Sequence, residues 1–128
     1  MDFDRIKYLL MALAKANGVG EEDLNGYNTE TDEFEWSINW KSDLNKSFEM
    51  DIDRFQSGVD LYEEALAKND LLAAKAGLQD AKIASQDLAN FFDAFREDLT
   101  KMMVDPRFKW PKFPDGYKVP EHYGYKNR

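Results

Sequence analysis

The side chains best suited to chemistry are carboxylates in two stretches, 33–40 and 47–53, where polar and apolar residues alternate. Alternation with a period of two is typical of half-buried β-strands, so the stretches predict an antiparallel β-hairpin. Pairing apolar with apolar residues sets acidic side chains opposite one another, because residues on one face of a sheet share a register. Like charges facing each other destabilise a sheet, which favours a binding role. This predicted acidic face consists of Glu33, Glu35, Glu49, Asp51 and Asp53.

Three interpretations of the acidic face stay open. It is a solvated surface whose repulsion salt screens, or it is neutralised by a basic segment of the same chain. In the third, it binds a basic protein surface, such as a nucleic-acid-binding enzyme whose cleft the carboxylates occupy in place of phosphates. Attraction between opposite charges would steer such an association.

The sequence predicts no metal site, no cofactor and no catalytic residue. The segment DIDRFQSGVDLYEE superficially resembles a calcium loop, but Phe55 and Gln56 stand where an oxygen ligand and a glycine are needed. There is no cysteine, and the one histidine, His122, has no Ser or Cys partner in a recognisable triad. Glycine-rich phosphate-binding motifs are also missing. The prediction for enzymatic activity therefore leans towards none.

The charge of this 128-residue chain is divided unevenly. Residues 106–128 hold six basic and two acidic side chains, a net of +4, whereas the other residues sum to −12. A negative body is unsuited to binding nucleic acid directly, because phosphate contacts need clustered Lys and Arg. No apolar run is long enough for a membrane span. The absence of cysteine favours a reducing compartment, so a cytoplasmic location is expected.

Apolar periodicity predicts helices over 2–17, 54–68 and 70–103. The third would be about 51 Å long, whereas a globule of this size is about 36 Å across. Either this helix bends near Gly77 or Ser85, which we expect, or one end projects and meets a partner. A glycine inside a helix costs about 1 kcal/mol, so Gly77 should have a packing reason.

The last segment, 106–128, is predicted to be an extended arm, because it holds all four prolines among its aromatic and basic residues. Its aromatic content favours docking of 106–118 on the body. The fold prediction is therefore α+β, mostly helical: an acidic domain over 1–105 with an N-terminal helix, a two-stranded antiparallel hairpin and a helical hairpin, followed by the arm. Aromatic anchors for a partner are Tyr27, Trp40, Trp110 and Tyr117.

These features predict a small acidic protein-binding module. Phage-encoded inhibitors of defence nucleases and immunity proteins against nuclease toxins are similar in size, acidity and lack of cysteine, although no motif is shared. The alternative is an oligomeric structural or assembly component that uses the apolar stripe over 71–102 and the arm. A homodimer is one such oligomer.

Overall fold

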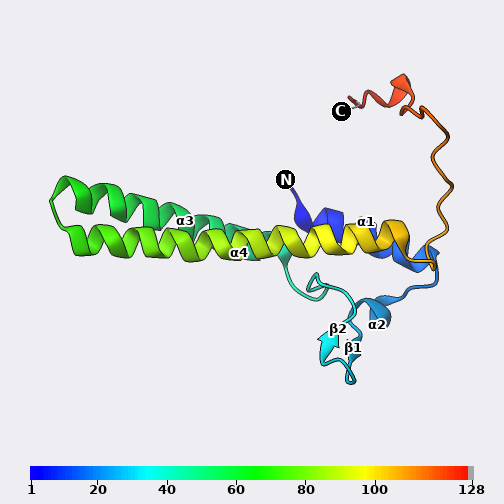
Figure 1. Cartoon of the computed structure of the whole chain (residues 1–128), viewed down its shortest axis with the longest axis horizontal. Coiled ribbons are helices and arrows are strands. Elements are labelled where there is room, and N and C mark those ends of the chain that lie inside the picture. The colour runs from blue at the N-terminus through cyan, green and yellow to red at the C-terminus, as the bar shows by residue number, and fades with distance from the viewer. Residues whose placement is uncertain (127–128) are drawn as a thin grey trace.

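One long helix organises this protein in the computed structural model, which describes residues 1–126 (Figure 1). Two shorter helices, of 14 and 24 residues, and several short elements are arranged around it. In chain order the elements are α1 (Phe3–Ala16), α2 (Glu21–Leu24), β1 (Tyr27–Asn28), β2 (Glu33–Phe34), α3 (Leu44–Ala67), α4 (Leu71–Val104) and the 3-10 turn η1 (Glu121–Tyr123).

Helix α4 runs through 34 residues without a break. Helix α3 pairs with its first half as an antiparallel hairpin, and α1 lies beside its second half (Figure 1). The closed end of the α3–α4 hairpin extends well beyond the short elements (Figure 1). The expected bend near Gly77 or Ser85 is therefore wrong, and the other alternative, a projecting end, describes the structure.

The α+β, mostly helical class with one antiparallel hairpin is confirmed, but the predicted position of the hairpin is wrong. Tyr27 pairs with Phe34 and Asn28 with Glu33, whereas 47–53 lies inside α3. Asp43 caps α3 by accepting the backbone N–H of Lys46, and helix-forming residues follow. The period of two was misleading because seven residues are too few to separate it from a helical pattern.

Burial does alternate along 35–40, although no strand within residues 1–126 pairs with this segment. Trp36, Ile38 and Trp40 are buried, and the residues between them are exposed. The carboxylate of Asp98 on α4 takes the place of a strand, because its two oxygens accept the backbone N–H groups of Ser37 and Ile38, each at 2.7 Å. A helix side chain therefore fixes this extended segment against the core.

Two glycines set the separation of α3 and α4. A Cβ on Gly77 would lie 2.6 Å from the carbonyl oxygen of Gly58 and 2.7 Å from the backbone nitrogen of Tyr62. A Cβ on Gly58 would lie 2.7 Å from the carbonyl oxygen of Gly77. Both contacts are with backbone, which cannot move aside as a flexible side chain can. The packing reason expected for Gly77 is therefore confirmed.

Replacing Gly77 with Ala should lower the melting temperature by roughly 4–8 °C, at about 4 °C per kcal/mol for a domain of this size. The better helix propensity of alanine stabilises the protein by about 1 kcal/mol. Forcing a methyl group against backbone atoms 2.6–2.7 Å away costs about 2–3 kcal/mol, the upper end of what overpacking usually costs, so the net loss of stability is about 1–2 kcal/mol. Gly20→Ala is the control, since its Cβ would meet nothing within 4 Å. Thermal unfolding followed by circular dichroism measures both, and an unchanged or higher melting temperature for Gly77→Ala would contradict the close packing.

Candidate interaction surface

The seam of the α3–α4 hairpin is made of small residues. In its projecting half the buried side is contributed by Gly58, Ala65, Ala74, Gly77, Ala81 and Ala84. In most paired helices large apolar side chains fill this position, because burying them is what stabilises the pair. Here the backbones approach so closely that large side chains have no room between them and must lie elsewhere.

Most of the large apolar side chains lie in two outer stripes, although Met50, Leu61, Leu72 and Ile83 are exposed at other positions of the two helices. On α3, Ile52, Val59 and Leu66 recur at intervals of seven residues, and on α4 the same interval separates Leu71 from Leu78 and Phe92 from Leu99, with Ser85 between. Residues seven apart lie on one side of a helix. With Phe55 and Met103 beside them, these side chains are 38–69% exposed.

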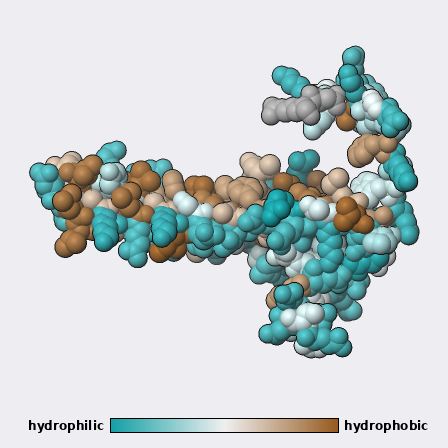
Figure 2. Space-filling view, viewed as in Figure 1, coloured by the Kyte–Doolittle hydropathy of each residue, from teal (hydrophilic) through white to brown (hydrophobic). Residues whose placement is uncertain are grey.

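Both stripes lie on the same side of the hairpin. At about 100° per residue, each stripe is turned in the same sense from its helix's buried seam, and in an antiparallel pair this brings the two stripes to one face. The ion pair between Arg54 and Asp80, 2.9 Å apart, marks the opposite face. Hydrophobic side chains are visible along the projecting hairpin in Figure 2. We call this surface the apolar face: Ile52, Phe55, Val59, Leu66, Leu71, Leu78, Phe92, Leu99 and Met103.

The apolar face is large for a protein of this size. From its exposed fractions, it presents on the order of 800 Å² of apolar residues, whereas the largest apolar patch of a typical monomer is about 300–600 Å². A surface of this extent is characteristic of an interaction site.

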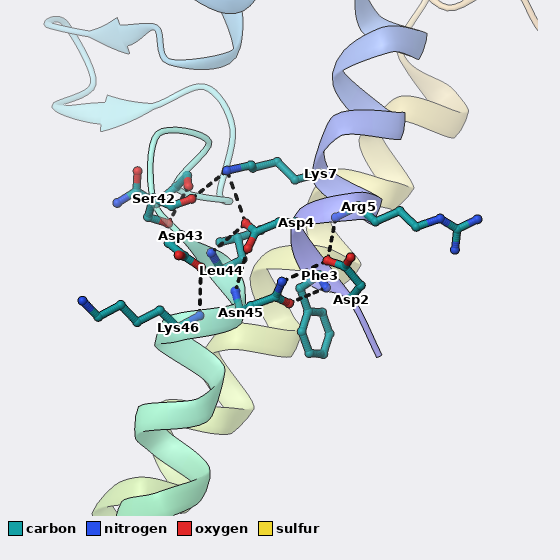
Figure 3. Close-up of polar contacts among 11 residues, drawn as sticks. Asp2, Phe3, Asp4, Arg5, Lys7, Ser42, Asp43, Leu44, Asn45 and Lys46 are labelled. Carbon is teal, nitrogen blue, oxygen red and sulfur yellow. Dashed lines mark hydrogen bonds and ion pairs between the residues drawn. The ribbon is translucent and has the colours of Figure 1, made fainter.

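The hairpin is positioned by a junction in which the N-termini of α1 and α3 meet (Figure 3). Asp4, in the first turn of α1, accepts the backbone N–H groups of Leu44 at 2.9 Å and Asn45 at 3.3 Å. In return, the Oδ1 atom of Asn45 accepts the backbone N–H of Phe3 at 2.7 Å. Each helix thus caps the other, and unpaired N–H groups on both sides are satisfied.

Carboxylates offset the repulsion between the two helix ends. Each N-terminus carries a partial positive charge, so two that face each other repel unless negative charge lies between them. Asp2 caps α1, Asp43 caps α3 and Asp4 lies between them. Burial opposes the ionisation of Asp4, but hydrogen bonds from Leu44 and Asn45 outweigh it and hold its pKa below the usual value. A further hydrogen bond joins the two segments at this junction, because the Nζ of Lys7 on α1 donates to the carbonyl of Ser42, just before α3, at 2.7 Å.

Asp4→Ala should destabilise the protein by about 1–2 kcal/mol, because two N–H groups at the start of α3 lose their acceptor. Asp53→Ala is the matched control: Asp53 is exposed on α3, its side chain makes no hydrogen bond or ion pair within residues 1–126, and its replacement should change stability by less than about 0.5 kcal/mol. Urea unfolding followed by tryptophan fluorescence measures both. Equal effects of the two substitutions would contradict a special role for the junction.

A cluster around Trp36 ties the start of the arm to the body. The Nζ of Lys101 lies 4.5 Å from the centre of the buried Trp36 ring, and Phe108 packs against the ring edge-on, with centroids 6.2 Å apart. Arg107 forms ion pairs with Glu35 and Asp105. Hydrogen bonds from the Arg107 side chain and backbone hold the pKa of Asp105 down at about 2. The first residues of the arm are therefore docked.

The Asp105 carboxylate should stabilise the fold in a pH-dependent way. Its folded pKa of about 2 lies below the ordinary value of 3.8, so its contribution is complete above about pH 4 and is lost as the pH falls through 2. The advantage of the native chain over Asp105→Asn should be on the order of 1 kcal/mol at neutral pH, since half-exposed Arg107 is partly screened, and should shrink on acidification. Urea unfolding at a series of pH values checks this, and a constant difference would contradict it.

The structure does not bring the five predicted carboxylates together. Glu33 lies in β2, and Glu35 is engaged by Arg107 and Lys101. The other three are on α3, where residues two apart point to nearly opposite sides. Asp51 faces α4: burial, and after it the charge of Asp87, raises its pKa. The cross-strand charge pairs expected from the sequence are therefore absent.

The predicted aromatic anchors have different surroundings. Trp40 is 3% exposed and belongs to the core, so its use as an exposed anchor is wrong. Tyr27 is about half exposed, packs against Phe34 and donates a hydrogen bond to Asp32. Trp110 is also about half exposed, and its Nε1 donates to the carbonyl of Met102 at 2.8 Å.

Beyond Trp110 the predicted docking of the arm fails, because residues 111–118 are exposed. Phe113 and Tyr117 pack against each other with their rings tilted by 38° and the ring centroids 5.6 Å apart. With Met103 and Trp110 they line an open apolar groove of about 890 Å³. After leaving the end of α4 the arm runs away from the helix, and its last part then turns back in the direction of the N-terminus (Figure 1).

A family model, described as a family of unknown function (DUF6853), matches residues 3–112. The chain belongs to this family. The match includes α1, the whole α3–α4 hairpin and the docked start of the arm, and it ends close to the point where the arm leaves the body. No curated protein matches the chain.

The crystal structure of a functionally unknown protein from Neisseria meningitidis MC58 is similar to this chain, with a TM-score of 0.78 and 22% identity. The similarity covers 89% of this chain and all of that one. It shows that the fold is shared. Within residues 1–126, no helix combines the length and the apolar character needed to cross a bilayer.

Proposed function

We propose that this protein is a protein-binding module whose binding element is the apolar face of the projecting α3–α4 hairpin. The observation that supports this is the arrangement of sizes: glycine and alanine fill the seam, and leucine, valine, isoleucine and phenylalanine lie outside it. A hairpin selected for its own stability would bury the large side chains instead.

Exposed apolar surface of this extent has a physical cost when nothing covers it. Side chains such as Leu71 and Leu78, 69% and 52% exposed, order water around them and promote aggregation. Covering them in a complex would release that free energy at about 25 cal/mol for each Å². This is the assembly role that the stripe over 71–102 predicts, with the addition of a second stripe on α3.

Binding of a basic, nucleic-acid-binding enzyme through carboxylates remains a prediction of the composition. With the five carboxylates dispersed over β2, the Trp36 cluster and different sides of α3, the apolar face is the better-supported binding element.

Photo-crosslinking in the source cell tests this proposal. A photoreactive amino acid in place of Leu78, on the apolar face, should give a discrete covalent adduct with a protein. The matched control places it at Ile83, which is 38% exposed on the same helix but turned well away from Leu78. Adducts at Leu78 and not at Ile83 support the proposal. No adduct at Leu78, or equal adducts at both positions, would overturn it.

A further inference from the structure

Building on the proposed function, we infer that the partner of the apolar face is a second copy of this chain, and that two hairpins pack face to face as a four-helix bundle. The two-fold axis runs parallel to the hairpin, between the two apolar faces. Each α3 then lies against α4 of the other copy. Three features of the surface support this arrangement: its repeat, its charged borders and its area.

The outer stripes repeat as helix–helix interfaces do. The seven-residue interval from Ile52 to Val59 and Leu66, and from Leu71 onwards along α4, is the interval by which apolar side chains of one helix insert between those of another. The seam inside the hairpin uses a separate set of positions. Each helix therefore carries a second repeat that the single chain leaves 38–69% exposed, although Phe92 also contacts Phe3 and Phe48. A second copy supplies helices of matching period.

Charged columns border the two stripes and have opposite signs. Three residues before each stripe position, α3 carries Glu49, Gln56 and Glu63. The equivalent positions of α4 are Lys75, Lys82, Ala89 and Arg96. Charged residues in this relation to an apolar repeat select the partner helix and its orientation. Within the described part of the chain, neither these two glutamates nor these two lysines form an ion pair.

The two-fold arrangement brings opposite charges together. Because Gly77 packs on Gly58 and Tyr62, Lys75 and Glu63 lie at the same height along the hairpin, on its two outer edges. A two-fold axis parallel to the hairpin preserves height and exchanges the edges. It therefore sets Lys75 of each copy beside Glu63 of the other, and the contact occurs twice, as a symmetric interface requires.

An alternative two-fold axis across the hairpin would place α3 on α3 and α4 on α4. The acidic border would then face an acidic border and the lysines would face lysines, which is unfavourable. The charge distribution therefore selects between the two orientations. The segment 35–38 does not obstruct the bundle, because Asp98 and Lys101, which hold it, are turned away from the apolar face on α4.

The area agrees with what a stable dimer needs. The apolar face exposes on the order of 800 Å² per chain, and standard interfaces bury about 800 Å² on each partner. Homodimer interfaces are also more apolar than other protein surfaces, with charged residues at the border. The distribution of residue types on the hairpin has this form.

Sedimentation equilibrium of the full chain, from low micromolar to near-millimolar concentration, tests the inference. The native chain should be a dimer, and Val59→Gln with Leu78→Gln should make it monomeric at the same concentrations. Ile83→Gln is the control and should leave the dimer intact. Circular dichroism should show the same helix content in all three, since the replaced side chains are at the surface. A monomeric native chain, or a dimer that persists in the Val59–Leu78 variant, would overturn the inference.

A charge exchange tests the orientation. Lys75→Glu and Glu63→Lys should each raise the dissociation constant roughly tenfold, because each replaces two exposed attractive contacts with repulsive ones. The double variant should return to within about threefold of the native value, because opposite charges again face each other. A dissociation constant of the double variant that stays as high as that of the single variants would overturn the proposed two-fold arrangement.

The crosslinking experiment separates this inference from the proposed function. An adduct at Leu78 of twice the mass of the 14.9 kDa chain supports self-association. If the chain sediments as a monomer and Leu78 crosslinks to a different protein, the apolar face binds that protein. The proposed function then holds, and the inference that the partner is a second copy is overturned.

Discussion

The close packing of α3 on α4 is the constraint on which the rest of this structure depends. Gly58 and Gly77 bring the two backbones together, and the alanines continue the contact along the projecting half. Because no large side chain fits in this part of the seam, many of the large apolar side chains of both helices lie on their outer sides. Helix α4 continues without a break into this hairpin, which extends beyond the body (Figure 1).

The junction of α1 and α3 meets a second constraint, which arises from the length of α4. A helix of this length needs cover along both halves, and two shorter helices that start near its middle provide it (Figure 1). Their N-termini then face each other with like partial charges. Asp4 and Asn45 resolve the conflict by reciprocal capping, which ties the start of α3 to the start of α1.

Sequence reasoning found the long helix, the N-terminal helix and the extended arm, but it placed the β-hairpin wrongly. The alternation around Trp36 does correspond to alternate burial from Trp36 to Trp40, but Phe34 is exposed. The partner of this backbone is Asp98, 60 or more residues away. The stripe over 71–102 was recognised as apolar. The sequence analysis did not separate this stripe by residue size. Small residues of α4 form the buried seam with α3, whereas the large apolar residues form a separate, exposed column.

The sequence by itself determined local properties: where α1 and α4 begin and end, how charge is divided between body and arm, and which glycine needed a packing explanation. These follow from residue type and spacing within one or two turns. Only the tertiary structure decided which side of α4 meets α3 and that large side chains remain outside the seam. The reason is physical: those outcomes depend on the contact between Gly58 and Gly77, which lie far apart along the chain, and on backbone distances that no local pattern encodes.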